Sequence, residues 1–172
     1  MTLDRRTPLD TARLRFREME EGDFDQMAAL LGDPEMMRFY PAPKSQKEAA
    51  EWIRRSRERY AAHGFGLWII ETHDGEFVGD CGLTWQTSNG RDVLEVGYHV
   101  RADLQGRGYA TEAAQACVEE ARRRLAPTEL TAIIHPENTA SRRVAEKLGM
   151  THTEDDHGHD WIVRTVMSMR LR

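Results

Sequence analysis

The amino-acid sequence predicts a single α+β domain, residues 1–172, in which helices cover both faces of a mixed sheet. Three observations support this fold class. Asp-Gly at 74–75 and Asn-Gly at 89–90 separate apolar runs, as in antiparallel hairpins. Segments whose apolar residues recur at helical spacing precede and follow these runs. A chain of this length buries roughly 70% of the surface that its unfolded form exposes, which suits one core.

The first half of the chain is predicted to contain a strand, two helices and three further strands. Residues 13–17 are expected to form the first strand, and an amphipathic helix from residue 24 ends at Gly32-Asp33-Pro34. Ser45 and Glu48 form a capping-box pattern that begins a second helix, which extends to about residue 62. The three strands are expected at residues 65–71, 77–85 and 93–100.

A glycine loop between a predicted strand and a helix is the most informative segment. Gly106 and Gly108 lack a Cβ, so the backbone can turn tightly and present N–H groups to an anion at the positive end of the next helix. Arg107 adds a positive charge. An NTPase phosphate loop would need Lys and then Ser or Thr where the sequence has Tyr109-Ala110, and a dinucleotide fingerprint would need Gly or Ala in place of Thr111. An ordinary turn before a helix remains open.

The second half repeats the order of strand and helix. Residues 130–134 form a short apolar strand, Asn138 is suited to cap the next helix, and Gly149 to end it. A last strand is expected within residues 161–171. Cysteines occur only at positions 81 and 117, inside a predicted strand and helix, so we expect them to be buried and free of a disulfide.

Four motifs follow one another in the sequence: Glu95-Val96-Gly97-Tyr98, Gln105-x-x-Gly108-x-Ala110, Asn138-x-x-Ser141 and Lys147-Leu148-Gly149-Met150. Together they resemble the acetyl-CoA site of the GNAT superfamily of N-acetyltransferases. The closest resemblance is to the branch that contains the ribosomal-protein N-terminal acetyltransferases, whose Thr-x-Arg-Leu-x-Leu-Arg start is approximated by residues 11–17. The resemblance spans nearly the whole chain.

The resemblance implies a mostly antiparallel sheet in which residues 95–100 and 130–134 form a splayed parallel strand pair with acetyl-CoA in the gap. Gly97 fits a bulge in the first of these strands. Pantetheine would pair with the backbone of the splayed strand, and the pyrophosphate would take N–H groups from the loop. The cofactor-binding residues implied are His99, Val100, Gln105, Gly106, Arg107, Gly108, Tyr109, Ala110, Thr111, Asn138 and Ser141.

Direct acetyl transfer to a primary amine requires an oriented amine, a base that takes its proton, and stabilisation of an oxyanion. Most amines arrive as unreactive ammonium near neutral pH. Glu95 is the candidate base, because it lies on the strand that leads to the loop and some relatives use a glutamate at the matching position. His99 and His135 are alternatives, and a purely structural carboxylate remains open.

The departing thiolate needs a proton donor. Many superfamily members use a Tyr seven residues after the Asn, where this chain has Ala145. The resembled branch often has the Ser of Asn-x-x-Ser, which matches Ser141, although a packing or cofactor contact is the competing interpretation. Because the Tyr is absent, a non-catalytic acyl-CoA-binding sensor or interaction module is the alternative function.

The acceptor is expected to be a protein N-terminal α-amine or a small-molecule amine. Residues 36–40 and Trp85 are expected to line its pocket, and the acids of residues 152–160 to attract a cationic acceptor. Segment 152–160 also carries imidazoles, but they lack ligand spacing, so we expect an exposed hairpin connection and no metal cofactor.

Charge and hydropathy limit the partners. A net charge of −5 argues against general nucleic-acid binding. No apolar run approaches the roughly 20 residues that cross a bilayer, and the N-terminus lacks the apolar segment of a signal peptide. We therefore expect a cytoplasmic protein with no membrane partner. Exposed strand ends in the resembled fold often support dimers, which makes a homodimer a further expectation.

Overall fold

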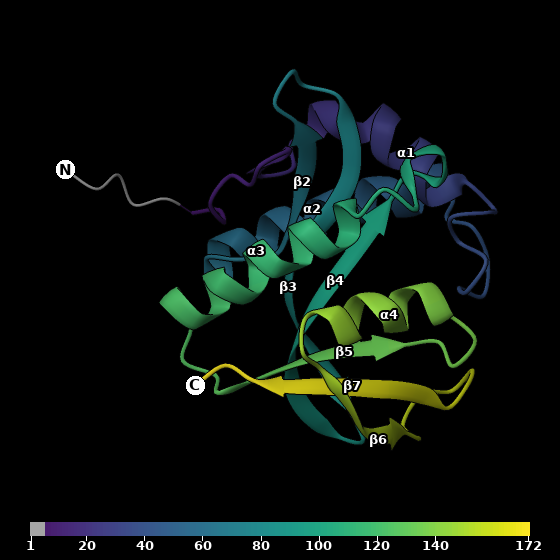
Figure 1. Ribbon diagram of the computed structural model, residues 1–172. Coiled ribbons are helices and arrows are strands. Elements are labelled where there is room, and N and C mark those ends of the chain that lie inside the picture. The colour runs from purple at the N-terminus through teal and green to yellow at the C-terminus, as the bar shows by residue number, and fades with distance from the viewer. Residues whose placement is uncertain (1–5) are drawn as a thin grey trace.

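A seven-stranded sheet with the order β1-β2-β3-β4-β5-β7-β6 organises the computed structural model, which describes residues 6–172 (Figure 1). Only β4 and β5 are parallel, and all other neighbouring strands are antiparallel. The strands are β1 Leu14–Arg17, β2 Leu67–Thr72, β3 Phe77–Ser88, β4 Arg91–Val100, β5 Glu129–Ile134, β6 Thr151–Asp156 and β7 Arg164–Arg170. This confirms the mixed, mostly antiparallel sheet. The predictions made on residues 1–5 lie outside the described residues.

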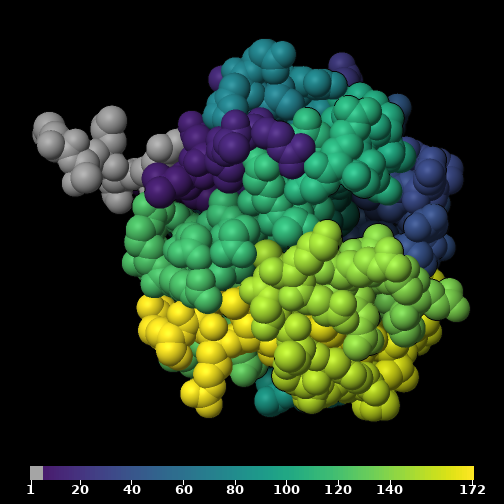
Figure 2. Space-filling model, viewed as in Figure 1, coloured from purple at the N-terminus to yellow at the C-terminus, as the bar shows by residue number. Residues whose placement is uncertain are grey.

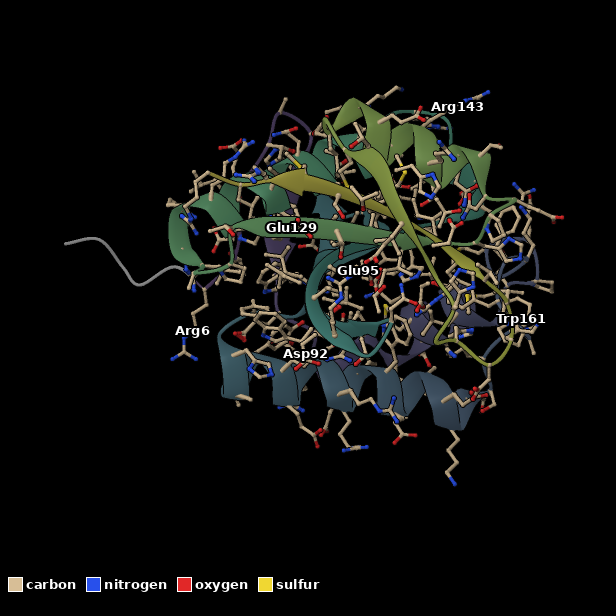
Figure 3. The ribbon with its side chains drawn as sticks, turned by 90° about the horizontal axis from the view of Figure 1, so that it is seen from below. Arg6, Asp92, Glu95, Glu129, Arg143 and Trp161 are labelled. Carbon is tan, nitrogen blue, oxygen red and sulfur yellow. The ribbon has the colours of Figure 1, made fainter. Side chains whose placement is uncertain are left out.

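Helices cover both faces of the sheet, as predicted. The helices α3 and α4 lie on one face, and α2 crosses the other face with α1 packed against it (Figures 1 and 3). The helices are α1 Phe24–Gly32, α2 Gln46–His63, α3 Tyr109–Arg124 and α4 Thr139–Lys147, with short 3-10 helices at Glu21–Asp23 and Ala102–Leu104. None of the helices in residues 6–172 is long and apolar enough to cross a membrane.

Two predicted helix starts are confirmed by their caps. The Ser45 hydroxyl accepts a hydrogen bond from the backbone N–H of Glu48, whose carboxylate accepts one in return from the N–H of Ser45. The Asn138 side chain accepts a hydrogen bond from the N–H of Ser141, at 3.0 Å, and begins α4. These local signals fix where α2 and α4 start, and hence which of their side chains face the sheet.

The hairpin of β3 and β4 is regular, and the bulge expected at Gly97 is wrong. Its pairing is unbroken from the Asn-Gly turn to the pair of Gly79 and Val100, with Gly97 opposite Gly82. A Cβ on Gly82 would stand 1.9 Å from the carbonyl oxygen of Gly66. Gly82 thus serves close backbone approach, whereas Gly97 leaves space open at the sheet surface, where a Cβ would make only ordinary contacts.

Residues 152–160 were expected to form only an exposed hairpin connection. This expectation is wrong for the first residues of the segment, which belong to an edge strand. Residues 151–156 form β6, which pairs with β7, and the connection is restricted to residues 157–163. The strand carries charged side chains, and in it only Asp156 is buried. Such charged edges discourage pairing with other chains and hide the apolar alternation that identifies a strand.

The core contains both cysteines. Cys81 on β3 and Cys117 on α3 are fully buried and free, with 3.6 Å between their sulfur atoms. Burial raises the pKa of the Cys81 thiol, so it stays protonated and unreactive. This confirms the prediction that the cysteines are small core residues.

Candidate active site

The parallel strands β4 and β5 part immediately after they meet. Their only ladder pair in the described chain is Glu95 with Thr131. The Thr131 hydroxyl donates a hydrogen bond to the carbonyl of Leu94, at 2.9 Å, and the N–H of Ile133 donates one to the Glu95 carboxylate, also at 2.9 Å. A side chain thus replaces the backbone partner that Ile133 loses, and the strands diverge beyond it.

A cavity of about 720 Å³ occupies this gap. The glycine loop and α4 line it on one face of the sheet, and α2, the segment before α2 and the β6–β7 connection line it on the other. Figure 2 shows a hollow where the teal glycine loop, the yellow-green α4 region and the blue segment before α2 meet. The cavity therefore connects the two faces of the sheet.

Alternation along β4 sorts its side chains between the two faces. Glu95, Gly97 and His99 face α2, and His99 shares a hydrogen-bond network with Trp52 of that helix. Tyr98 faces the other way, where its hydroxyl meets Ser141 of α4. One strand therefore supplies polar groups to both ends of the cavity.

Glu95 lies at the centre, between β5 and α2 (Figure 3). Burial raises the pKa of its carboxyl group to about 7, against the lowering effects of the Ile133 N–H and of Arg164, His99 and Arg59. A carboxyl group with this pKa is present in both protonation states at neutral pH. It can accept a proton there and release it again.

His99 belongs to a buried network that the sequence analysis did not anticipate. Its Nδ1 is 2.6 Å from the Oδ1 of Asp80, its Nε2 is 2.6 Å from the hydroxyl of Tyr40, and the Trp52 indole N–H donates to the Oδ2 of Asp80 at 3.0 Å. Burial lowers the pKa of His99, but Tyr40 and Asp80 outweigh it and raise that pKa to about 10. A raised pKa favours the protonated imidazole at neutral pH, which supports Glu95 over His99 as the base.

His135, the other alternative base, lines the cavity within an aromatic row. Its ring centroid is 5.1 Å from that of Phe39 and 5.6 Å from that of Trp161. Its Nδ1 accepts a hydrogen bond from the N–H of Glu137 at 3.1 Å. This histidine shapes the cavity wall beside Trp161, which lies at the outer edge in Figure 3.

The glycine loop has the predicted backbone geometry. Gly106 and Gly108 have φ values of 78° and 84°, in the left-handed region that favours glycine. Gly108 precedes α3 and supplies no side-chain cap, which leaves the first N–H groups of the helix for a ligand. Arg13 holds the loop, because its Nη1 donates to the carbonyl of Arg107 at 2.9 Å and its Nε to Glu112 at 2.8 Å.

The structure brings nearly all the expected cofactor residues to the cavity. Lining it are His99, Val100, Gln105, Gly106, Gly108, Tyr109, Ala110, Thr111, Asn138 and Ser141. Arg107 is the exception: its side chain is exposed and does not line the cavity. The carbonyl of Val100 accepts a hydrogen bond from the Gln105 side chain at 3.0 Å.

Ser141 has a partner that the sequence analysis missed. The Tyr98 hydroxyl is 3.0 Å from the Ser141 hydroxyl and donates to the Ser141 carbonyl at 2.9 Å, and both side chains line the cavity. Burial raises the pKa of Tyr98. Ala145 is fully buried within α4. The sequence offered one signal for this partner, which is the polar aromatic residue Tyr98 in the motif Glu95-Val96-Gly97-Tyr98.

Expectations for the acceptor pocket are partly wrong. Met36, Arg38, Phe39 and Tyr40 line the cavity, but Met37 is in the core and Trp85 points to the opposite face from its neighbours Thr84 and Gln86. The acids of residues 152–160 do not line the cavity either, and three of the four are engaged elsewhere. Asp156 binds Arg164, Glu154 binds Arg91, and Asp155 binds His152.

The wall formed by α2 was not predicted as part of the site. Trp52, Arg55 and Arg59 of this helix line the cavity. Helical spacing alone indicated that Trp52 faces the interior, but it did not show that the interior at this point is a cavity. Nothing in the sequence indicated that Arg55 and Arg59, one and two turns later, also line the cavity.

The acetyltransferase (GNAT) domain family matches residues 13–151. Protein YkkB of Bacillus subtilis is 36% identical over 154 residues, which cover 88% of this chain and 90% of YkkB. The N-acetyltransferase p20 of Bacillus licheniformis is 28% identical over 146 residues, covering 81% of this chain and 80% of p20. The split sheet and its glycine loop thus belong to an acyl-transferring class of enzyme. This chain is a member of the GNAT acetyltransferase family.

Solved structures agree on the fold. An acetyltransferase from Agrobacterium tumefaciens superimposes with a TM-score of 0.82 at 24% identity, covering 95% of this chain and 94% of its own. RimL, a ribosomal L7/L12 alpha-N-protein acetyltransferase in complex with coenzyme A, superimposes with a TM-score of 0.77 at 16% identity, covering 94% of this chain and 96% of RimL. MccE, a microcin C7 self-immunity acetyltransferase in complex with acetyl-CoA and AMP, gives 0.76 at 13% identity, covering 93% of each chain.

Proposed function

We propose that the protein transfers the acetyl group of acetyl-CoA directly to a primary amine in the cavity between β4 and β5. The proposal depends mainly on Glu95, which lies at the point where the two strands part and has a carboxyl group whose pKa is raised to about 7. It stands between the glycine loop on one face of the sheet and the α2 wall on the other. This position supports Glu95 as the proton acceptor for an amine that meets a thioester in the cavity.

The glycine loop supports acetyl-CoA as the co-substrate. The N–H groups around Gly106 and Gly108 line the cavity mouth at the positive end of α3, a suitable environment for a pyrophosphate. Exposed Arg107 would add positive charge outside the cavity. RimL and MccE, which share this fold, were solved with coenzyme A and acetyl-CoA respectively. The thioester would supply an activated acyl group with a thiolate leaving group.

Proton transfers are assigned to residues on the two faces. Glu95 takes the proton of the ammonium group, directly or through water, and the freed amine nitrogen bonds to the acetyl carbon. As the carbon–sulfur bond breaks, the Ser141 hydroxyl donates a proton to the sulfur and regains one, through water, from the nitrogen of the tetrahedral intermediate, which leaves a neutral amide. Tyr98 holds that hydroxyl in place. No covalent intermediate on the protein is required.

The acceptor is proposed to be a protein N-terminal α-amine or a small-molecule amine. A cytoplasmic location, a homodimer and one domain over residues 1–172 stay predictions. Because position 145 is Ala and not Tyr, one other function stays a candidate, that of a sensor that binds acyl-CoA without turnover. The pair of Tyr98 and Ser141 supports the enzyme over the sensor, because it supplies a hydroxyl group in that part of the cavity.

The test is release of free thiol from acetyl-CoA in the presence of a panel of amines, with mass spectrometry of the products. The panel contains peptides with different N-termini and small amines, each measured with and without protein. Thiol release together with an acetylated amine would support the proposal. Binding of acetyl-CoA without release from any amine would favour the sensor.

A further inference from the structure

A guanidinium group without an anionic partner faces the cavity from α2. Arg59 is half-buried and lines the cavity, and among the described residues it forms no hydrogen bond or ion pair. Burial and the charge of Arg55 lower its pKa, whereas Glu95 acts in the opposite direction. Partial burial of an unpaired cation is unfavourable, so a bound anion would be stabilised at this position.

Two more cations on this side of the cavity have little compensation. Arg55, one turn before Arg59, is exposed at the rim with Glu51 at 3.7 Å. Arg38 lies over the ring of Phe39, 4.8 Å from its centroid, without a carboxylate partner in residues 6–172. Both are exposed and contribute mainly to the field at the entrance.

Carboxylates do not balance these charges. Within the described chain, Glu35 and Glu95 are the only acidic residues that line the cavity, and Glu95 is protonated about half of the time at neutral pH. Arg164, a further cation of the lining, already has Asp156 as its partner at 2.5 Å. We call the part of the cavity lined by α2 and the segment before it the acceptor end. This end therefore has a surplus of positive charge.

This surplus disfavours an acceptor that is only a cation. A simple ammonium ion would approach unpaired guanidinium groups of the same sign, and like charges in a partly desolvated site repel each other. An acceptor that also carries an anion removes this cost, because its negative group can bind Arg59 while its amine faces Glu95.

Aromatic side chains on the same side of the cavity suit an apolar body. Phe39, His135 and Trp161 form the aromatic row of the cavity, and Trp161 is 44% exposed. Flat aromatic surfaces at the edge of a cavity stack with planar ligand groups. The row and Arg59 both line the acceptor end of the cavity.

We infer that the acceptor is an anionic amine, a molecule with a primary amine and a carboxylate or phosphate group, whose anion binds Arg59. This inference rests on the proposed acetyl transfer and specifies its substrate class. An aromatic α-amino acid combines the amine, the anion and a planar body, and it serves as the probe. Phosphoethanolamine, compared with ethanolamine, separates phosphate from carboxylate.

The experiment compares kcat/KM, expressed per free amine, for phenylalanine and phenylalaninamide, which share the α-amino group and the ring but differ in the negative charge and hence in the pKa of the amine. We expect the acid to be preferred by roughly 10-fold or more, the range of one charge-assisted hydrogen bond. Arg59→Gln should lower the ratio of kcat/KM for the acid to that for the amide by about the same factor. The ratio of acid to amide isolates the anion, because any effect of Arg59 on the pKa of Glu95 is common to both.

Arg57→Gln is the matched control, because Arg57 is on the same helix but pairs with exposed Glu21 and does not line the cavity. It should leave the ratio unchanged. Equal kcat/KM for the charged and neutral members of both probe pairs, or an Arg59→Gln effect on the KM of acetyl-CoA alone, would overturn the inference while acetyl transfer stands.

Absence of thiol release from any amine would contradict the proposed function, and binding then tests the anion site separately. Calorimetry of the same two probe pairs on protein saturated with coenzyme A gives this second measurement. Binding of a charged member that is lost in Arg59→Gln would support the anion site. Binding of the charged and neutral members with equal affinity, or of neither, would overturn it.

Discussion

The Glu95 carboxylate accepts a hydrogen bond from the backbone N–H of Ile133, with 2.9 Å between Oε2 and N, where β4 and β5 cease to pair. The bond fixes the carboxylate across the gap and uses one of its oxygens. Oε1 has no hydrogen-bond partner within residues 6–172 and is left for a ligand. The residue that completes the split of the sheet is thus also the candidate base.

Stability should fall as pH rises through the titration of Glu95. Its pKa is raised from 4.5 to about 7 by burial, so between these values the unfolded chain has released a proton that the folded chain retains. The free energy of unfolding then decreases by at most about 3 kcal/mol across this window and levels off above it. Glu95→Gln, measured by urea denaturation, should be more stable than the native protein at pH 8 but not at pH 4. Glu129→Gln, at an exposed position of β5, is the control, and an equal response of both variants would contradict the assignment.

The pair of Asp80 and His99 should stabilise the fold most strongly at low and neutral pH. The pKa of His99 is raised from 6.5 to about 10, so its contribution is complete below about 6.5 and is lost as pH rises towards 10. Asp80→Asn leaves a buried imidazolium without its counter-ion and should lower the free energy of unfolding at pH 6 by about 3 kcal/mol. Asp92→Asn, exposed on the same hairpin, should change it little.

An NMR titration of the native protein tests the same pair without a variant. The His99 ring signals should remain those of the protonated form between pH 6 and pH 9. Titration near pH 6.5, the ordinary value, would contradict the assigned network.

Removal of the Ser141 hydroxyl should slow turnover without weakening cofactor binding. Ser141→Ala should lower kcat by about 100-fold, the lower range for a lost proton donor, with the KM of acetyl-CoA unchanged. Tyr98→Phe should cause a smaller loss, and the double variant should be no slower than Ser141→Ala, because Tyr98 acts through Ser141. Additive losses in the double variant would assign Tyr98 an independent role. Thr139→Ala, at the exposed start of the same helix, is the control.

The left-handed glycine before α3 should control affinity for acetyl-CoA. Gly108→Ala introduces a Cβ at a φ of 84° and 3.3 Å from an Arg13 nitrogen, so the loop must shift its N–H groups. We expect the Kd for acetyl-CoA to rise about tenfold, from roughly 1–2 kcal/mol of backbone strain. Gly22→Ala, where a Cβ meets open space, should leave the Kd unchanged. Unchanged affinity in Gly108→Ala would separate this loop from the cofactor.

Local chemistry explains what could be predicted from the sequence. A capping box at Ser45, an Asn at the start of α4 and two glycines before α3 each act within a few residues. Their consequences for helix starts and for the loop were predictable for that reason. The family resemblance then supplied the splayed strand pair, which no local pattern contains.

The features of the site that the sequence did not predict depend on contacts between segments that are distant in the chain. Asp80 meets His99 because the hairpin register places them opposite each other, and one residue of slip would send both to the other face. The same parity turns Trp85 away from the cavity. Arg59 reaches the site only because α2 crosses the sheet opposite α4. A carboxylate at position 80, inside an apolar strand, was the one available signal that a buried partner existed.

The central claim is that Glu95 accepts the amine proton in an acetyl-CoA site, and paired calorimetry and thiol release on the native protein and Glu95→Gln test it most directly. Both proteins should bind acetyl-CoA with equal affinity. The native kcat/KM should rise with pH through about 7, the pKa of Glu95, and Glu95→Gln should lose about 100-fold or more of kcat together with this limb. Full turnover by Glu95→Gln, or no binding of acetyl-CoA to the native protein, would contradict the account.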